Sequence, residues 1–364
     1  DRGLEDVFAT QDEIASAVTA ALLPKLRDEE APTTRGGTRN VEAYDLYLKG
    51  REKWRGRDVV ELREAVDDFR AAVEMDPDFA LAWSGLADAI DALAWRDIDA
   101  VRLLPEGRLA ALRALSLDPQ MAEGWASAGI LAAEFDRDHE VGELALRRAI
   151  ELRPSYANAH QQLSGLLTNL GRIEEARPYL RKAVELDPLS WFFHLNLGDR
   201  LVVASELDEA RAAYERSEEL IGNGRGYLKL LIYARQFGMD ATEAAEIAER
   251  AAAGMGIPDP AGWRVVGEAI VTGNRREEAI AVLDTEDGLL PRDKFGLRAQ
   301  LGQTEETIAY LQEMQRSGAG DLWRIGVFPE WDSLRDDPRF IEIVKEMGIP
   351  NGYDPVAKQP IWPQ

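Results

Sequence analysis

The chain has 364 residues with 66 acidic and 43 basic side chains, which gives a formal charge of -23 at pH 7. A surface of this charge repels phosphates, so the composition excludes nucleic acid as a partner. The absence of cysteine excludes disulfides, zinc–thiolate sites and cysteine nucleophiles.

No run of eighteen apolar residues and no signal-peptide pattern occurs, so we expect no direct membrane insertion of this chain. The chain begins at Asp1 without methionine, which leads us to expect that it is part of a longer protein. Its localisation is not fixed by the sequence. The cytoplasm is favoured, and a transmembrane segment before Asp1 would place the chain in the periplasm.

Residues 1–27 are predicted to form an amphipathic helix. Thr10 and Glu13 match a capping box, and Ile14, Val18 and Leu22 then recur at every fourth position. Residues 28–40 hold a proline, two glycines and three threonines among mixed charges. This composition predicts a linker and the main flexible junction of the chain.

A recurring sequence motif organises the next part of the chain. Predicted helices end on an apolar residue, a charged residue and a proline four times, and the proline stops each helix because it cannot continue the hydrogen-bond ladder. A large side chain at the fourth position of the next helix recurs with a basic period of 34 residues, which is lengthened by one residue in one interval and by about eight in the first. Small residues lie where two helices would cross. The prolines and the fourth-position residues are Pro77, Pro119, Pro154 and Pro188, and Trp83, Trp125, His160 and His194.

These residues resemble the tetratricopeptide repeat, closely from Phe79 to Gly222 and more loosely on either side. The resemblance implies an all-α fold in which about sixteen to twenty helices stack as antiparallel pairs into a right-handed superhelix. We expect seven to eight repeats over residues 41–315, capping helices over 316–350 and an extended tail over 351–364. Each repeat of such a solenoid contacts mainly its neighbours, so we expect graded unfolding.

A narrower resemblance concerns three stretches, DVFATQDEIA, RNVEAYDLYLKGR and LRDDPRFIEIVKEMG. They are similar to the C-terminal repeat region of bacterial multidomain signalling proteins. There, repeats follow a nucleotide cyclase, a winged-helix regulator or a kinase, and residues 1–27 would be the tail of a TolB-like segment. The resemblance implies a non-catalytic protein or peptide interaction module with a regulatory role. The alternative is the regulatory or oligomerising region of an adenylate or guanylate cyclase whose catalytic domain lies upstream.

The sequence predicts no catalytic, cofactor or metal site. His160 and His194 are 34 residues apart at the same repeat position and would lie on neighbouring helices. They either share a metal or replace the packing tryptophan of that position. No third ligand has a suitable spacing, so we favour packing.

The concave face of the repeats is the predicted binding surface, because such faces usually bind partners. In the tetratricopeptide repeat, five positions of the first helix line this face. Carboxylates and amides at these positions favour a basic or amide-rich protein or peptide, with homo-oligomerisation left open. The four repeats show no lysine there, which disfavours the clamp that recognises chaperone tails. The predicted groove residues are Asp88, Asp91, Glu123, Glu134, Asn158, Gln161, Asn169, Phe192 and Asp199.

Overall fold

The structure of the protein is a computed structural model that describes residues 37–286, 289–318 and 320–363. The predicted N-terminal helix over 1–27 and residues 28–36 of the predicted linker lie outside the described residues. The flexibility predicted for residues 28–40 therefore stays a prediction.

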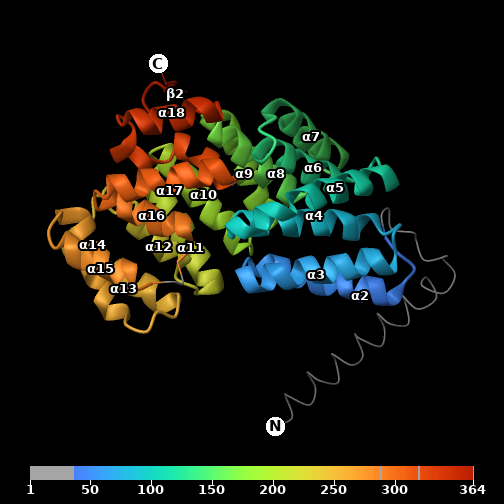
Figure 1. The fold of residues 1–364 in the computed structure, drawn as a ribbon, viewed down its shortest axis with the longest axis horizontal. Coiled ribbons are helices and arrows are strands. Elements are labelled where there is room, and N and C mark those ends of the chain that lie inside the picture. Colours follow the sequence, from blue (N-terminus) through green and yellow to red (C-terminus); the bar gives the residue numbers. More distant parts are fainter. Residues whose placement is uncertain (1–36, 287–288, 319, 364) are drawn as a thin grey trace, which may run out of the picture.

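Helices that follow one another in the sequence pack as pairs, and the pairs stack side by side (Figure 1). The all-α fold of stacked helix pairs predicted from the sequence is confirmed. None of the described helices is long and apolar enough to cross a membrane. Within the described residues the pairs are α2 (Val41–Gly56) with α3 (Val59–Met75), α4 (Ala80–Ala94) with α5 (Leu104–Leu117), α6 (Ala122–Glu134) with α7 (His139–Leu152), α8 (Ala157–Asn169) with α9 (Ile173–Leu186), α10 (Trp191–Val203) with α11 (Leu207–Ile221), α12 (Arg225–Ile232) with α13 (Ala241–Gly254), α14 (Arg264–Thr272) with α15 (Arg276–Asp284), and α16 (Pro291–Gln300) with α17 (Thr304–Ser317). Short 3-10 helices precede α5 (η1, Ile98–Leu103) and α14 (η2, Pro260–Trp263).

The repeated proline ends helices α3, α5, α7 and α9 through the residue before it. A proline disfavours the helical region for its predecessor, because its ring crowds that residue's backbone. Asp76, for example, has φ -138° and ψ 92°, and Arg153 has φ -144° and ψ 89°. Asp118 and Asp187 adopt the same extended conformation. The stop signal in the sequence is therefore a backbone constraint.

The large residue at the fourth helical position fastens each new helix to the end of the previous one. The indole N–H groups of Trp83 and Trp125 donate to the carbonyl oxygens of Pro77 and Pro119, each at 2.9 Å. His160 and His194 make the same contact through Nε2, with the carbonyls of Pro154 at 2.9 Å and Pro188 at 3.0 Å. Because a carbonyl can only accept, Nε2 carries the proton in both histidines. The packing interpretation of these histidines is confirmed.

Close helix packing explains a glycine that departs from the usual alanine of the repeat. At Gly142 of α7, an added Cβ would lie 2.6 Å from Ala133 Cβ and 2.8 Å from the carbonyl oxygen of Gly129. Such contacts are too short for any side chain, so α6 and α7 approach more closely than alanine would allow. The departure is required by packing.

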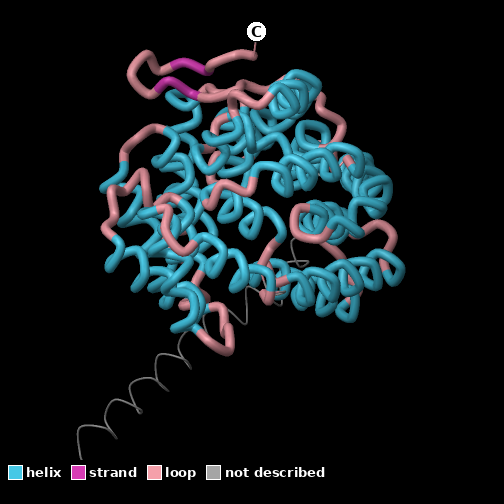
Figure 2. The backbone as a smooth tube through the Cα atoms, turned by 60° about the vertical axis from the view of Figure 1, so that its left-hand side comes forward, coloured by secondary structure: helices cyan, strands magenta, loops and turns pink. Residues whose placement is uncertain are grey.

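The C-terminal part of the chain folds back over the middle repeats. It consists of η3 (Gly320–Gly326), η4 (Pro329–Leu334), α18 (Pro338–Met347) and the strands β1 (Tyr353–Asp354) and β2 (Gln359–Pro360). Figure 2 shows its two strands at one edge of the helical array, close to the C-terminus. Phe328, Trp331 and Phe340 are fully buried in one hydrophobic cluster with Leu163 and Leu167 of α8. The segment after α17 therefore covers the middle of the array as well as its end.

The last residues differ from the expected extended tail. β1 and β2 pair as an antiparallel hairpin, with Tyr353 opposite Pro360. Pro360 packs over the turn between α8 and α9, where Gly171 has a positive φ of 75° and an added Cβ would lie 2.4 Å from Pro360 Cβ. A straight tail would leave this turn uncovered.

Two buried contacts tie this C-terminal part to distant helices. Arg324 Nη2 of η3 donates to Asp199 Oδ2 of α10 at 2.7 Å. The hydroxyl of Tyr233, just after α12, donates to Glu330 Oε2 of η4 at 2.8 Å. We call this folding back of η3 and η4 onto α8, α10 and α12 the closure.

Candidate binding pocket on the concave face

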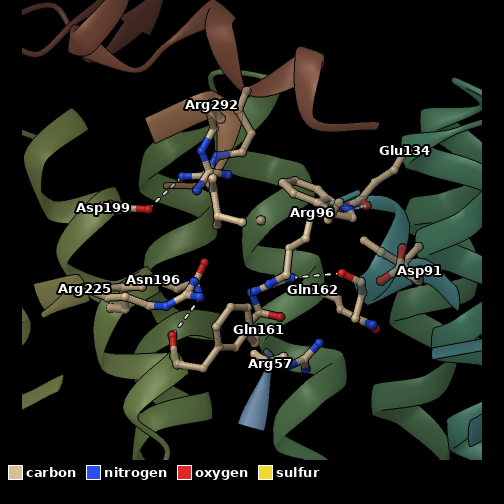
Figure 3. A pocket seen from close by; sticks show the side chains of 18 of the residues that line it. Arg57, Asp91, Arg96, Glu134, Gln161, Gln162, Asn196, Asp199, Arg225 and Arg292 are labelled. Carbon is tan, nitrogen blue, oxygen red and sulfur yellow. Dashed lines mark hydrogen bonds and ion pairs between the residues drawn. The ribbon is translucent and has the colours of Figure 1, made fainter. Parts of the chain in front are cut away.

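A partly open pocket lies between the first helices of six successive pairs and the C-terminal part that folds over them (Figure 3). Its volume is about 110 Å³, and we call it the concave pocket. The inner faces of α2, α4, α6, α8, α10 and α12 supply most of its walls. The charged residues that line it are Arg57, Asp88, Asp91, Arg96, Glu134, Asp199, Arg200, Arg225, Lys229, Arg292, Asp293 and Arg324.

The structure brings together eight of the nine predicted groove residues. All of them except Glu123 line the concave pocket. The carboxylate of Glu123 pairs instead with Arg153 at 2.7 Å, outside this pocket. Trp191 also lines the pocket, although the sequence indicated only Phe192 from that aromatic run. The placement agrees with the repeat positions, while the role of these residues in binding stays a prediction.

Three carboxylates from α4 and α6 form what we call the acidic end of the pocket. Asp88 accepts a hydrogen bond from the Ser127 hydroxyl at 2.6 Å, and Glu134 accepts one from the Trp95 indole. Burial raises the pKa of Asp88 to about 6, and burial together with the Asp88 charge raises the pKa of Asp91 to about 7. A protonated Asp91 can donate the hydrogen bond that joins it to Glu134.

At the opposite side, α10, α12, α16 and η3 form the basic end. Asp199 is 2% exposed, and its Oδ2 lies 2.7 Å from Arg324 Nη2 and 3.8 Å from Lys229 Nζ. Burial alone would raise the pKa of Asp199, but Lys229 and Arg324 outweigh it and hold that pKa below its usual value. Asp293 pairs with Lys229 at 3.5 Å and with Arg292 at 3.3 Å.

A stack of three side chains separates the concave pocket from a more open depression. The guanidinium of Arg57 lies 3.9 Å from the ring centre of Trp54 and 4.7 Å from that of Phe192. All three side chains line both the pocket and the depression, whose volume is about 490 Å³. Trp54 and Arg57 lie at the end of α2, and Phe192 lies at the beginning of α10. The stack therefore forms a wall shared by the pocket and the depression.

Basic residues outnumber acidic residues in the pocket by seven to five. The expected preference for a basic or amide-rich partner rested on the carboxylates and amides of the groove and did not take these cations into account. It stays a prediction. The sequence did not predict these cations, because Arg324 reaches the pocket only through the closure, and Arg225, Lys229 and Arg292 follow the four clear repeats.

Metal binding by the histidines finds no further support. Nε2 of His160 and Nε2 of His194 are each committed to a proline carbonyl. Among the described residues, no group of three or more histidine, aspartate or glutamate side chains is arranged to hold a metal ion.

Comparisons with known proteins identify the family of the repeats in the middle of the chain. Residues 128–190 and 166–224 match the family model of the tetratricopeptide repeat. A stretch of 89 residues is 37% identical to a putative adenylate cyclase 3 of Rhizobium meliloti (strain 1021), and it makes up 24% of this chain and 15% of that protein. The chain therefore spans a small part of this relative's length.

Solved structures of repeat proteins are also similar. A thermophilic tetratricopeptide repeat protein of Thermus thermophilus is 18% identical with a TM-score of 0.43, over 54% of this chain and 100% of that chain. The type IV pilus biogenesis factor PilW is 17% identical with a TM-score of 0.40, over 67% of this chain and 99% of that chain. From the family model and the stacked helix pairs, residues 128–224 of this chain are tetratricopeptide repeats.

Proposed function

We propose that this chain is a non-catalytic interaction module and the regulatory part of a bacterial signalling protein. Tetratricopeptide repeats bind protein or peptide partners, which supports the interaction role. The similarity to a putative adenylate cyclase supports a signalling context, although it covers only 89 residues. The eight groove residues that line the concave pocket are proposed as its ligand-contacting residues.

The observation that carries the regulatory part of this proposal is the closure. Asp199 and Arg324 are 125 positions apart in the sequence, yet they form one buried ion pair at the wall of the concave pocket. A ligand in the pocket touches both the repeats and the segment that closes over them. Binding of a ligand therefore favours one arrangement of the repeats and the C-terminal segment over other arrangements. Such a shift between arrangements is what a regulatory signal requires.

The test compares the isolated chain with the complete gene product. With nucleoside triphosphates and Mg²⁺ or Mn²⁺, the isolated chain is expected to show no turnover. In the complete gene product, Arg324→Ala is expected to change cyclic-nucleotide formation, DNA binding or phosphoryl transfer, whichever activity that product has. Arg316→Ala is the control, because Arg316 is exposed and pairs only with Glu313 of its own helix. Equal output from both variants and the unchanged protein would contradict a regulatory role.

A second candidate function is oligomerisation of a cyclase, and exposed apolar side chains on α5 and α7 favour it. Leu109 and Leu112 of α5 are 68% and 61% exposed, and Leu144 of α7 is 63% exposed. Exposed apolar side chains on neighbouring repeats favour a contact with another protein, and a second copy of the chain would bury them.

Light scattering over a concentration series tests this candidate. If two copies associate through α5 and α7, Leu109→Glu with Leu144→Glu is expected to yield monomers at concentrations where the unchanged chain is dimeric. Leu189→Glu is the control, because Leu189 is 70% exposed but lies in the loop before α10. A chain that is monomeric throughout the series argues against oligomerisation by this region.

A further inference from the structure

The basic end of the concave pocket carries more positive charge than its own carboxylates neutralise. Five cationic side chains line it, against the two carboxylates of Asp199 and Asp293. Both carboxylates are already engaged. Asp199 pairs with Arg324 and Lys229, and Asp293 pairs with Lys229 and Arg292.

Two arginines at this end remain without a carboxylate. Arg200 is 8% exposed, and among the described residues its Nη1 donates only to Asn196 of its own helix, to Oδ1 at 2.8 Å and to the backbone oxygen at 3.3 Å. Its Nε is buried without a hydrogen-bond partner. Arg225 lies over the ring of Trp191 at 5.9 Å and forms no ion pair with any described residue. Burial lowers the pKa of Arg200 to about 10 and also lowers that of Arg225, as expected for guanidinium groups held away from water.

Other buried polar atoms of the pocket also lack protein partners. They include Gln162 Oε1, Asn169 Oδ1 and Asp91 Oδ1, whose side chains are less than 10% exposed. Buried polar groups in folded proteins are almost always hydrogen-bonded, so several such atoms around one cavity indicate a polar occupant. Figure 3 shows the labelled arginine and amide side chains converging on this space from several helices.

We propose that the concave pocket binds a small organic anion, a carboxylate or a phosphate ester, whose oxygens are held by Arg200 and Arg225. Guanidinium groups suit both oxyanions, because each offers paired N–H donors. The amides of α8 would then contact the rest of the ligand. A pocket of about 110 Å³ has room for several waters or for a small ligand. This inference does not depend on the regulatory role, because the site would bind its ligand without any output domain.

The stack of Trp54, Arg57 and Phe192 is the entrance to this site. Arg57 has a positive φ of 59° at the end of α2, a conformation that costs non-glycine residues about 1 kcal/mol. It is also 8% exposed and forms no ion pair with the described residues. A strained and buried side chain between the pocket and the depression fits a gate that must move before a ligand can enter.

Titration calorimetry on the whole chain tests the site with two probes, citrate and inorganic phosphate, at one ionic strength kept constant with sodium chloride. We expect at least one probe to bind with a dissociation constant below about 1 mM, and the stronger probe identifies the class of anion. Arg200→Gln and Arg225→Gln are each expected to weaken that probe at least tenfold. Arg216→Gln is the control, because Arg216 is exposed on α11 and pairs with Glu219. No binding of either probe up to 10 mM, or binding that both pocket variants leave unchanged, would overturn the proposal.

The variant Arg57→Gly tests the gate, and its melting temperature shows whether it is still folded. Arg57→Gly removes both the strained conformation and the buried charge, so we expect a melting temperature no lower than that of the unchanged chain. We also expect faster association of the bound probe in stopped-flow measurements. Arg137→Gly is the matched control, because Arg137 has a positive φ of 57° but is exposed. Association rates that are equal in the two variants would contradict the assignment of Arg57 as the gate.

Discussion

Single side chains in the concave pocket are held in protonation states that the same residues would not have in water. Burial dominates at the acidic end, where the pKa of Asp91 rises to about 7. Nearby cations dominate at the basic end, where the pKa of Asp199 falls. The pKa values of the buried aspartates therefore shift in opposite directions at the two ends.

Asp91→Asn is expected to change how stability depends on pH. In the folded chain Asp91 holds its proton up to about pH 7, whereas the unfolded chain releases it near pH 4. The folded state therefore binds more protons between these values, so the Asp91 contribution to the free energy of unfolding decreases as pH rises from about 4 to about 7. The variant lacks this loss and should gain stability relative to the unchanged chain at higher pH.

Urea unfolding at pH 5 and pH 8 measures this effect. The control is Asp99→Asn, because Asp99 is exposed in η1. A stability difference between the Asp91 variant and the unchanged chain that is equal at both pH values would contradict the burial of an ionisable Asp91.

At the scale of helices, the repeated phrase in the sequence predicts both the end of one helix and its attachment to the next. Proline sets the extended conformation of the residue before it, and the ring N–H six positions later donates to the proline carbonyl. The inner faces of α4, α6, α8 and α10 were therefore predictable from local rules. The closure was not, because it depends on how small rotations between successive pairs add up, which no local pattern encodes. The cation of η3 was missed for the same reason, and those of α12 and α16 were missed because they follow the four clear repeats.

Trp125→Phe removes the indole N–H and keeps most of the ring. We expect a loss of about 1 kcal/mol in the free energy of unfolding, because the Pro119 carbonyl loses its donor while the apolar packing is largely preserved. Trp362→Phe serves as the control, because Trp362 is half exposed in the C-terminal residues. Equal stability of the two variants in urea unfolding would show that the fourth-position contact contributes nothing.

At the scale of the whole molecule, we expect the closure to make unfolding more cooperative than it is in an open repeat array. An open array loses its repeats gradually, because each contacts only its neighbours. Here the hydrophobic cluster that contains Leu163 of α8 also contains Phe328 and Phe340 from the C-terminal part. Contacts between such distant parts of the chain make the middle repeats and the C-terminal part depend on each other.

We therefore expect residues 80–350 to unfold in one transition, in place of the graded unfolding expected for an open solenoid. Circular dichroism and tryptophan fluorescence should report the same urea midpoint. Arg324→Ala should lower the stability by about 3 kcal/mol, since it leaves Asp199 short of its closest cation. In this variant the urea midpoints from circular dichroism and from tryptophan fluorescence should no longer coincide. Graded unfolding of the unchanged chain would show that the closure adds little to its stability.

The contact between η3 and α10 also restricts how this protein can change in length. An open solenoid can gain or lose a repeat by duplication, because a new pair only needs to fit its neighbours. Between Asp199 and Arg324, an added pair of helices would rotate and displace η3, so that Arg324 could no longer reach Asp199. The number of helix pairs between α10 and η3 is therefore fixed by the closure, and insertions should be tolerated only in loops outside that interval.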